Sequence, residues 1–269
     1  MLGFLIIATG NYYKYLPNLI KSIEKYYPSN IQKKYYIFSN HNLNLEFIKN
    51  YEVFYFEHKP FPNSTLFRFH EFDKVQKKLL NETDMLCYID SDSLIVRNPI
   101  TDLFDDELYG FEHGVNIANI ALNLPYERNI NSTAYVSYGF ERKYIIGGFW
   151  GGKTKRLVNI FEELKNNINT DLNKGIIACF HDESHINKYF SKNLDSKIYQ
   201  TKYILGEIDS YNNTKAWDTD LSLEQCRDNF IINNDIALLK NGDFFSIFLE
   251  KNHSKERNYY GKDEKISLQ

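Results

Sequence analysis

The chain has 269 residues, 43% of them hydrophobic and 25% charged, with a formal net charge of −3 at pH 7. This composition is that of a globular protein, and the length fits one domain with a large core, so a disordered or fibrous chain is excluded. Lys and Arg are spread along the sequence and give no basic field, which argues against nucleic acid as a partner.

The cysteines and the first residues give information on the cellular compartment. Three cysteines, none in a C-x-x-C pair, indicate neither a disulfide framework nor a zinc site. Residues 1–8 are apolar, but no basic segment precedes them and the sequence soon turns polar, unlike a signal peptide or a membrane span. We therefore expect a soluble cytoplasmic protein without a transmembrane anchor.

Apolar runs and helical periodicities alternate along the chain. Residues 2–8 form a continuous apolar run that ends at Thr9-Gly10-Asn11, which predicts a buried parallel strand and a turn. Apolar residues between 16 and 23 then recur at helical spacing, with Pro17 in the first turn. Further strands are predicted at 35–38, 53–56, 85–89 and 236–239, and further helices at 66–80, 157–164 and 183–190. This order predicts an α/β fold with a mostly parallel central sheet.

Two aspartates follow the predicted strand at 85–89. Asp90 and Asp92, separated by Ser91, leave the carboxyl end of that strand, where open α/β sheets bind ligands. Two carboxylates can hold a hard divalent ion while substrate phosphates fill its other positions. Such a sequence is also common in ordinary turns, so both interpretations stay open at this point.

Two other segments combine residues that suit a ligand site. Phe180-His181-Asp182-Glu183-Ser184-His185 concentrates imidazoles and carboxylates before a predicted helix, where acidic residues also favour the helix dipole and Asp182 or Ser184 could cap it. The order is not H-E-x-x-H, so zinc is disfavoured. The glycine pairs 147–148 and 151–152 flank Phe149-Trp150 and fit either close approach to a ligand or a β-bulge.

Taken together, these segments resemble glycosyltransferase family six, the family of the histo-blood-group A and B transferases and α-1,3-galactosyltransferase. The most specific pieces are Tyr126-Glu127-Arg128 with Ala134-Tyr135, residues 147–152, and residues 181–189. The resemblance spans nearly the whole chain. It implies a GT-A fold, in which a Rossmann-like nucleotide-binding half is merged with an acceptor-binding half, and α-1,3 transfer with retention.

The resemblance also implies roles for particular residues. Metal binding falls to Asp90 and Asp92, which hold Mn²⁺ against the diphosphate, and Glu183 is the catalytic carboxylate. The remaining residues fall into three groups: nucleotide-binding Ile7, Ala8, Tyr12, Lys251 and Arg257; donor-sugar-binding Arg68, Ile146, Gly147, Gly148 and Asp182; and acceptor-binding His113, Phe180 and His181.

Within the single domain 1–269, we expect residues 1–100 to bind UDP and metal, and 101–250 to bind donor sugar and acceptor. Residues 251–269 form a mobile tail that closes over the diphosphate. Mammalian members have tryptophan where this chain has Phe180, and residues 206–235 match relatives poorly.

The expected reaction is transfer of GalNAc or Gal from a UDP-sugar to a galactose-type glycan. Ile146-Gly147-Gly148 aligns with the Leu-Gly-Gly of the A-type transferase rather than the bulkier Met-Gly-Ala of the B-type, which favours UDP-GalNAc over UDP-Gal. Three alternatives remain: UDP-GlcNAc as donor, a UDP-sugar hydrolase, and a binding module that retains the fold without turnover.

Overall fold

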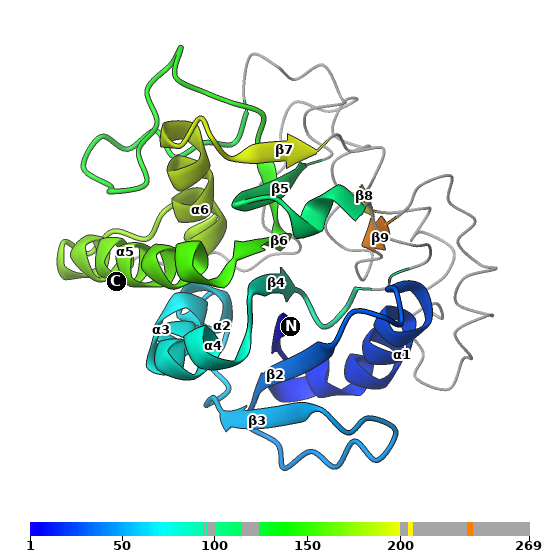
Figure 1. Cartoon of the computed structure of the whole chain (residues 1–269). Helices are drawn as coiled ribbons and strands as arrows, with labels where there is room; N and C mark the ends of the chain where they lie inside the picture. The colour runs from blue at the N-terminus through cyan, green and yellow to red at the C-terminus, as the bar shows by residue number, and fades with distance from the viewer. Residues whose placement is uncertain (94, 96–100, 114–123, 200–203, 207–235, 239–269) are drawn as a thin grey trace, which may run out of the picture.

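The computed structural model describes residues 1–93, 95, 101–113, 124–199, 204–206 and 236–238. Its centre is a seven-stranded sheet in the order β3-β2-β1-β4-β6-β5-β7 (Figure 1). The strands of this sheet are β1 (Leu2–Ile7), β2 (Lys33–Ser39), β3 (Tyr51–Tyr55), β4 (Met85–Ile89), β5 (Leu108–Glu112), β6 (Ile145–Lys153) and β7 (Lys197–Tyr199). A separate pair of parallel strands consists of β8 (Ile204–Gly206) and β9 (Ile236–Leu238).

Helices cover both faces of the sheet, which makes the molecule a three-layer α/β structure (Figure 1). One face packs on α1 (Leu16–Tyr26), and the other packs on a group of helices drawn on the left of Figure 1. These are α2 (Asn63–Leu66), α3 (Arg68–Lys74), α4 (Gln76–Glu82), α5 (Thr154–Asn173) and α6 (His181–Lys192). Two 3₁₀ helices, η1 (Gly10–Tyr15) and η2 (Thr101–Phe104), complete the described helical segments.

Six of the seven strands run in the same direction, and β6 alone in this sheet runs against them. The pairs β1–β2, β2–β3, β1–β4 and β5–β7 are parallel, whereas β6 is antiparallel to both β4 and β5. The carboxyl ends of the parallel strands therefore meet the amino end of β6 at one edge. The prediction of an α/β, GT-A-like fold with a mostly parallel sheet is confirmed.

A layer of aromatic side chains lies between the sheet and helices α3 and α5. Trp150 stacks on Tyr88 with ring centroids 5.3 Å apart, and it also contacts Phe69 and Phe161. These four rings are 2% exposed or less. Each large ring removes about 150–250 Å² of surface from water, so this layer is a main contributor to the stability of the core.

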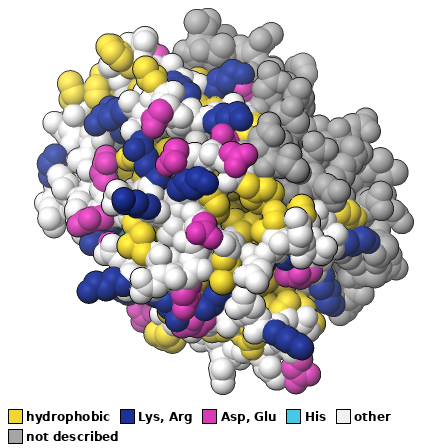
Figure 2. Space-filling model, viewed as in Figure 1, with side chains coloured by type: hydrophobic (Ala, Val, Ile, Leu, Met, Phe, Trp, Pro, Cys, Tyr) yellow, Lys and Arg dark blue, Asp and Glu magenta, His cyan; other side chains and the backbone are white. Residues whose placement is uncertain are grey.

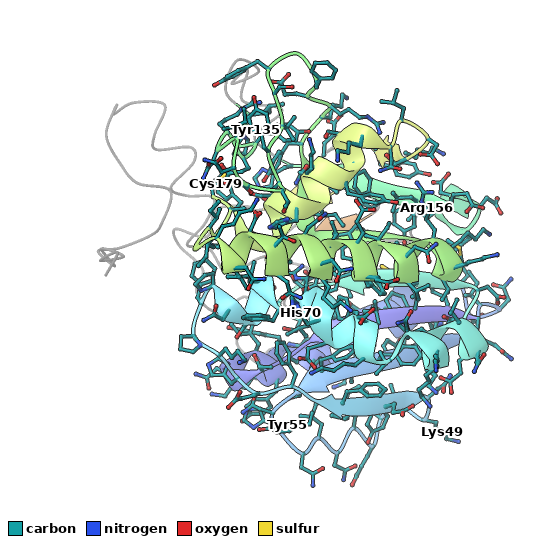
Figure 3. All side chains as sticks on the ribbon, turned by 90° about the vertical axis from the view of Figure 1, so that its left-hand side faces the viewer. Lys49, Tyr55, His70, Tyr135, Arg156 and Cys179 are labelled. Atoms are coloured by element: carbon teal, nitrogen blue, oxygen red, sulfur yellow. The ribbon has the colours of Figure 1, made fainter. Side chains whose placement is uncertain are left out.

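Helix α5 lies between α6 and the helices α3 and α4, as Figure 3 shows from the side. His70 of α3 bonds to Asn169 of α5 at 2.8 Å, and Arg156 of α5 bonds to Asn193, the residue after α6, at 2.9 Å. On the face in Figure 2, acidic and basic side chains are interspersed over the described surface. Among the described residues, no helix is sufficiently long and apolar to cross a lipid bilayer.

The chain leaves the sheet after β5 and returns to it at β6. His113 N–H donates to Tyr144 O at 2.7 Å, and Glu112 pairs with Ile145, so this excursion is closed at its base. Within β6 the register then shifts, because Gly110 pairs with Trp150 while Glu112 pairs with Ile145. Two steps along β5 thus correspond to five along β6, and β6 carries a bulge between residues 145 and 150.

Several element predictions needed revision. The helix predicted at 66–80 is three short helices, α2 to α4, and the strands at 35–38 and 53–56 are β2 and β3 with shifted bounds. Pro17 does lie in the first turn of α1, as predicted. The strands β5, β6 and β7 were not predicted. The late strand at 236–239 is present as β9, outside the main sheet.

Candidate functional site

The two predicted metal-binding aspartates lie on the turn that follows β4. Asp90 N–H donates to Gly148 O at 3.0 Å and Ser93 N–H donates to Asp90 O at 3.1 Å, which fixes the backbone of the turn. Asp92 is 8% exposed. Tyr88, two residues earlier and on the same face of the strand, donates its hydroxyl to Asp90 Oδ1. The carboxylates therefore leave the sheet at the edge predicted from the sequence.

Arg68, at the start of α3, is buried in the middle of this site. Its Nε lies 3.0 Å from Asp182 Oδ2 and its Nη2 lies 3.9 Å from Asp90 Oδ1. The guanidinium also lies over the Tyr88 ring, 4.4 Å from its centroid. Burial alone would lower the pKa of Arg68, but the carboxylates of Asp182 and Asp90 hold it above its ordinary value. Arg68 is thus a permanent cation surrounded by carboxylates.

For the pKa of Asp182, the effect of burial outweighs that of the neighbouring opposite charge. Burial raises its pKa to about 6, and Asp90 adds to this effect, while Arg68 lowers the pKa in opposition. The side chain is 4% exposed. A buried carboxylate paired with a guanidinium can accept hydrogen bonds from the hydroxyls of a bound sugar, because water competes weakly there.

The bulge in β6 connects the parts of the site. Gly147 O accepts from Arg68 Nη1 at 2.9 Å and from Trp150 Nε1 at 3.0 Å, while Gly147 N–H donates to Glu183 Oε2 at 2.7 Å. A Cβ atom at position 147 would lie 2.9 Å from Glu183 Oε2, closer than real Cβ contacts. A methyl group there would therefore force Glu183 to shift. Of the two explanations for the glycines, the bulge applies at Gly147, and approach to a ligand stays a prediction.

Glu183 lies in the first turn of α6 and is held against β6. Asn187, one turn further along the helix, accepts from Ile145 N–H at 2.8 Å and donates to Ile145 O at 2.9 Å. The pKa of the buried Tyr144 is raised well above its ordinary value by burial and then by the neighbouring Glu183 carboxylate. The hydrogen bond from Gly147 N–H stabilises a negative charge on the Glu183 carboxylate and fixes the orientation of this side chain.

The predicted acceptor residues lie at the start of α6 and just after β5. His181 has a positive φ of 48°, and burial lowers its pKa to about 4, so its imidazole is neutral at pH 7. Phe61, 65% exposed, contacts His181 edge-to-face at 4.8 Å. Phe180 is the N-cap residue of α6, and His113 follows β5 with 5% exposure. Neither Asp182 nor Ser184 caps the helix; instead Ser184 Oγ accepts from Phe180 N–H at 2.9 Å.

The predicted nucleotide residues follow β1 at the same edge of the sheet. Ala8 is fully buried, and its N–H and C=O bond to Phe38 O at 2.8 Å and Ser39 Oγ at 2.7 Å. Ile7 is half-buried and Tyr12, on η1, is 51% exposed. Since β1 pairs in parallel with β4, these residues lie beside the Asp90 turn. Lys251 and Arg257 lie outside the described residues.

The Asp90 turn fits a divalent ion that arrives with a nucleotide diphosphate. No three His, Cys, Asp or Glu side chains in the described ranges are grouped to hold a metal by themselves. Carboxylates are the ligands that hard cations prefer, and phosphates can supply further oxygens. The hydroxyls of Ser91 and Ser93 are buried and lack a hydrogen-bond partner among the described residues. Buried polar atoms are normally paired, so this turn is suited to a polar ligand.

The structure brings together Arg68, Asp90, Gly147, Asp182 and Glu183, all of which were predicted from the sequence. Ile146 differs, because its side chain is 3% exposed and packs in the core with Phe149. Sequence reasoning missed Tyr88, Asn187 and Phe61. Strand spacing before Asp90 and helical spacing after Glu183 could have indicated the first two, whereas nothing marks an isolated exposed phenylalanine.

Comparison with known proteins matches most of the chain to one family. The family model for glycosyltransferase family 6 matches residues 1–216. The chain is 32% identical over 216 residues to the O-antigen biosynthesis glycosyltransferase WbnI of Escherichia coli, covering 77% of this chain and 90% of the relative. It is 24% identical over 212 residues to the human globoside α-1,3-N-acetylgalactosaminyltransferase 1, covering 76% of this chain and 60% of that relative.

Proposed function

Because the chain belongs to glycosyltransferase family 6, and is by that membership a hexosyltransferase, we propose that it is a retaining α-1,3-glycosyltransferase. In this proposal it transfers GalNAc from UDP-GalNAc to a galactose-type glycan, with Mn²⁺ bound at Asp90 and Asp92. The observation that carries the proposal is the contact of Arg68 with Asp182, Asp90 and the Gly147 bulge, next to Glu183. This cluster places one fixed cation and several oriented carboxylates at the ligand-binding edge of an α/β sheet.

Departure of UDP builds negative charge on the β-phosphate as the bond to the anomeric carbon breaks. A divalent ion held by Asp90 and Asp92 would neutralise that charge when it is bound. The buried Arg68 contributes a cation that needs no reorientation during the reaction, because Asp182 and Gly147 O already fix the guanidinium. We propose that Lys251 and Arg257 add positive charge over the diphosphate.

The anomeric carbon becomes electron-poor as UDP leaves. Glu183 is positioned to respond in either of two ways. Its carboxylate can bond to that carbon, after which the acceptor hydroxyl displaces it with loss of a proton, so that two inversions give retention. Alternatively, it stabilises the positive charge while the acceptor hydroxyl attacks from the face that UDP leaves. Both routes need an ionised Glu183 carboxylate in a fixed orientation, and the hydrogen bond from Gly147 N–H favours both.

The donor preference rests on Gly148. We propose that its missing side chain leaves room for an N-acetyl group at the second carbon of the sugar; the human relative is named as an N-acetylgalactosaminyltransferase. One methyl group in such a site is worth about 1–3 kcal/mol, or about 10- to 200-fold in specificity. We expect a higher kcat/KM for UDP-GalNAc than for UDP-Gal, and we expect Gly148→Ala to slow UDP-GalNAc more. Faster turnover of UDP-Gal by the wild type would contradict this assignment.

Release of UDP tests the whole proposal. Purified protein with Mn²⁺ is supplied with UDP-GalNAc, UDP-Gal or UDP-GlcNAc, with and without a panel of galactose-terminated glycans, and free UDP is measured. Glycan-stimulated release, abolished by excess EDTA, is expected. Release that is indifferent to glycans would identify a hydrolase, and binding without release would identify a UDP-sugar-binding module.

A further inference from the structure

The Tyr126-Glu127-Arg128 motif lies outside the reaction centre, and its side chains anchor two segments: residues 141–142 and the turn before α6. Tyr126 donates its hydroxyl to Arg142 O at 3.1 Å and packs edge-on against Tyr144. Arg128 bonds to Glu141 Oε1 at 2.8 Å, within the excursion between β5 and β6. Glu127 instead reaches across to the turn that precedes α6. This last contact links the motif to the active site.

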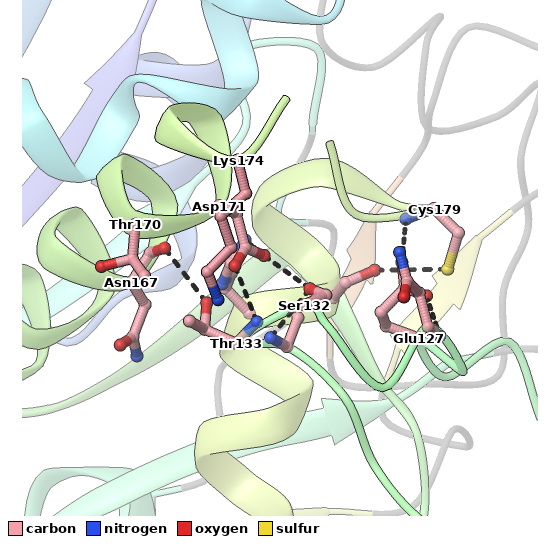
Figure 4. Close-up of polar contacts among 12 residues, drawn as sticks. Glu127, Ser132, Thr133, Asn167, Thr170, Asp171, Lys174 and Cys179 are labelled. Atoms are coloured by element: carbon pink, nitrogen blue, oxygen red, sulfur yellow. Dashed lines mark hydrogen bonds and ion pairs between the residues drawn. The ribbon is translucent and has the colours of Figure 1, made fainter. Parts of the chain in front are cut away.

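Glu127 is a buried carboxylate, and each of its two oxygens accepts one hydrogen bond from the backbone. Oε2 accepts from Cys179 N–H at 2.7 Å and Oε1 accepts from Asn129 N–H at 2.6 Å (Figure 4). The side chain is 6% exposed. Charge-assisted bonds to backbone N–H groups are about twice as strong as neutral ones, so this carboxylate clamps two chain segments together.

The clamped turn leads directly into the acceptor-side residues. Three consecutive N–H groups of this turn are satisfied: Cys179 by Glu127, Phe180 by Ser184 Oγ at 2.9 Å, and His181 by Ala178 O at 2.8 Å. The second and third bonds come from within the turn and α6 themselves. The bond to Glu127 comes from 52 residues away in the sequence and sets the place of the turn relative to the rest of the protein.

The donor-side residues of the same helix have separate anchors. Asp182 is held by Arg68 at 3.0 Å, and Glu183 is held by Gly147 N–H at 2.7 Å. Asn187 holds the helix itself to Ile145. Loss of the Glu127 contact would therefore shift the turn that carries Phe180 and leads into His181, while Asp182 and Glu183 keep their own anchors.

We propose that Glu127 is a positioning residue for acceptor binding, which places Phe180 and His181 through its bond to Cys179. The inference rests on the proposed transferase function. Glu127→Gln keeps one oxygen acceptor but replaces the other by an NH₂ group, which cannot accept from a backbone N–H. The variant can then keep only one of the two bonds, to Cys179 N–H or to Asn129 N–H, and the bond that remains is no longer charge-assisted.

The test compares transfer with hydrolysis, two reactions that share the donor. For Glu127→Gln we expect the acceptor KM to rise about tenfold or more, since small misplacements of positioning groups have effects of this order. UDP-GalNAc KM and the slow release of UDP to water should change by less than about twofold. The ratio of transfer to hydrolysis therefore falls. Glu127→Asp, which keeps the charge but shortens the reach, should lower the ratio in the same direction and replaces Glu127→Gln if that variant does not fold.

Asp171→Asn is the matched control. Asp171 is equally buried, at 1% exposure, and accepts from Ser132 Oγ at 2.5 Å and Thr133 N–H at 2.7 Å, so it anchors the same excursion to α5 (Figure 4). Asp171 Oδ2 also lies 3.8 Å from His185 Nε2, further along α6 than Glu183, so we expect Asp171→Asn to lower stability with a much smaller change in the ratio than the Glu127 variants show. An unchanged ratio in the Glu127 variants, or an equal fall in Asp171→Asn, would overturn the positioning role. A wild type that releases no UDP would instead overturn the proposed function.

Discussion

Gly147→Ala provides a direct test of whether the placement of Glu183 matters. The new Cβ atom would lie 2.9 Å from Glu183 Oε2 and 3.1 Å from both its Cβ and Cγ. Ordinary contacts of this kind are 3.4–4 Å. The carboxylate end could rotate away, but the Glu183 Cβ is part of α6, which Asn187 holds to β6. The substitution must therefore displace Glu183 or stretch its 2.7 Å bond to Gly147 N–H.

The displacement is several tenths of an ångström, which is large for a reacting group. Misplacement by 1 Å can cost about 100-fold in rate, so we expect kcat of Gly147→Ala to fall about 10- to 100-fold. The KM for the donor should change less than kcat, because the three atoms nearest to the new methyl group all belong to Glu183. Steady-state kinetics with saturating glycan measures both constants.

Glu183→Gln separates charge from position. A glutamine oxygen can still accept from Gly147 N–H, so this variant keeps the geometry and loses the charge, with an expected loss of about 100-fold or more in kcat. Because both substitutions act on one group, the double variant should be little slower than Glu183→Gln alone. An unchanged kcat in Gly147→Ala, or full additivity in the double variant, would refute the argument.

Three further predictions concern the metal, the buried cation and pH. Asp92→Asn should weaken Mn²⁺ activation by about 10- to 100-fold, the size seen for perturbed metal sites; an unchanged Mn²⁺ titration contradicts this. Arg68→Met should lower the free energy of unfolding by about 3–5 kcal/mol in urea, because Asp182 keeps a buried charge without its partner; a loss under about 1 kcal/mol argues against it. Burial lowers the pKa of His185 to about 4 from 6.5, against the opposing effects of Asp171 and Glu127, so the unfolded chain binds a proton that the folded protein excludes. The stability that neutral His185 contributes is complete above pH 6.5 and is lost as pH falls toward 4, by up to about 1.4 kcal/mol per pH unit. His185→Gln should therefore flatten the dependence of the free energy of unfolding on pH, measured by urea titration. Equal slopes in the variant and the wild type would refute this prediction.

Local patterns predicted the first elements of the fold well. The apolar run at 2–8 and the spacing of residues 16–23 report burial directly, and both elements formed where expected. The strands β5 and β6 were missed for a physical reason. Glycines weaken strand patterns, and the bulge at 145–150 breaks the alternation that identifies a strand. The antiparallel course of β6 depends on pairing with β4, which no local signal encodes.

For the candidate site, the sequence indicated the carboxylates but not all of the side chains that contact them. Asp90 and Glu183 stand out because carboxylates at the end of an apolar run are chemically conspicuous. The buried partners that orient them are ordinary in sequence: Tyr88 and Asn187 have many equally plausible core roles. The sequence marks Glu127 only as part of a motif. Its contact with Cys179 joins segments 52 residues apart and forms only when the chain is folded.

The closed base of the β5–β6 excursion has a consequence for protein engineering. Glu112 pairs with Ile145, and His113 N–H bonds to Tyr144 O, so the strands on either side stay in register whatever the length of chain between them. The entropy of closing a loop rises slowly, by about 0.6 kcal/mol for each doubling of its length. Changes of chain length in the excursion that leave residues 126–142 and their contacts in place should therefore be tolerated, without moving the Gly147 bulge.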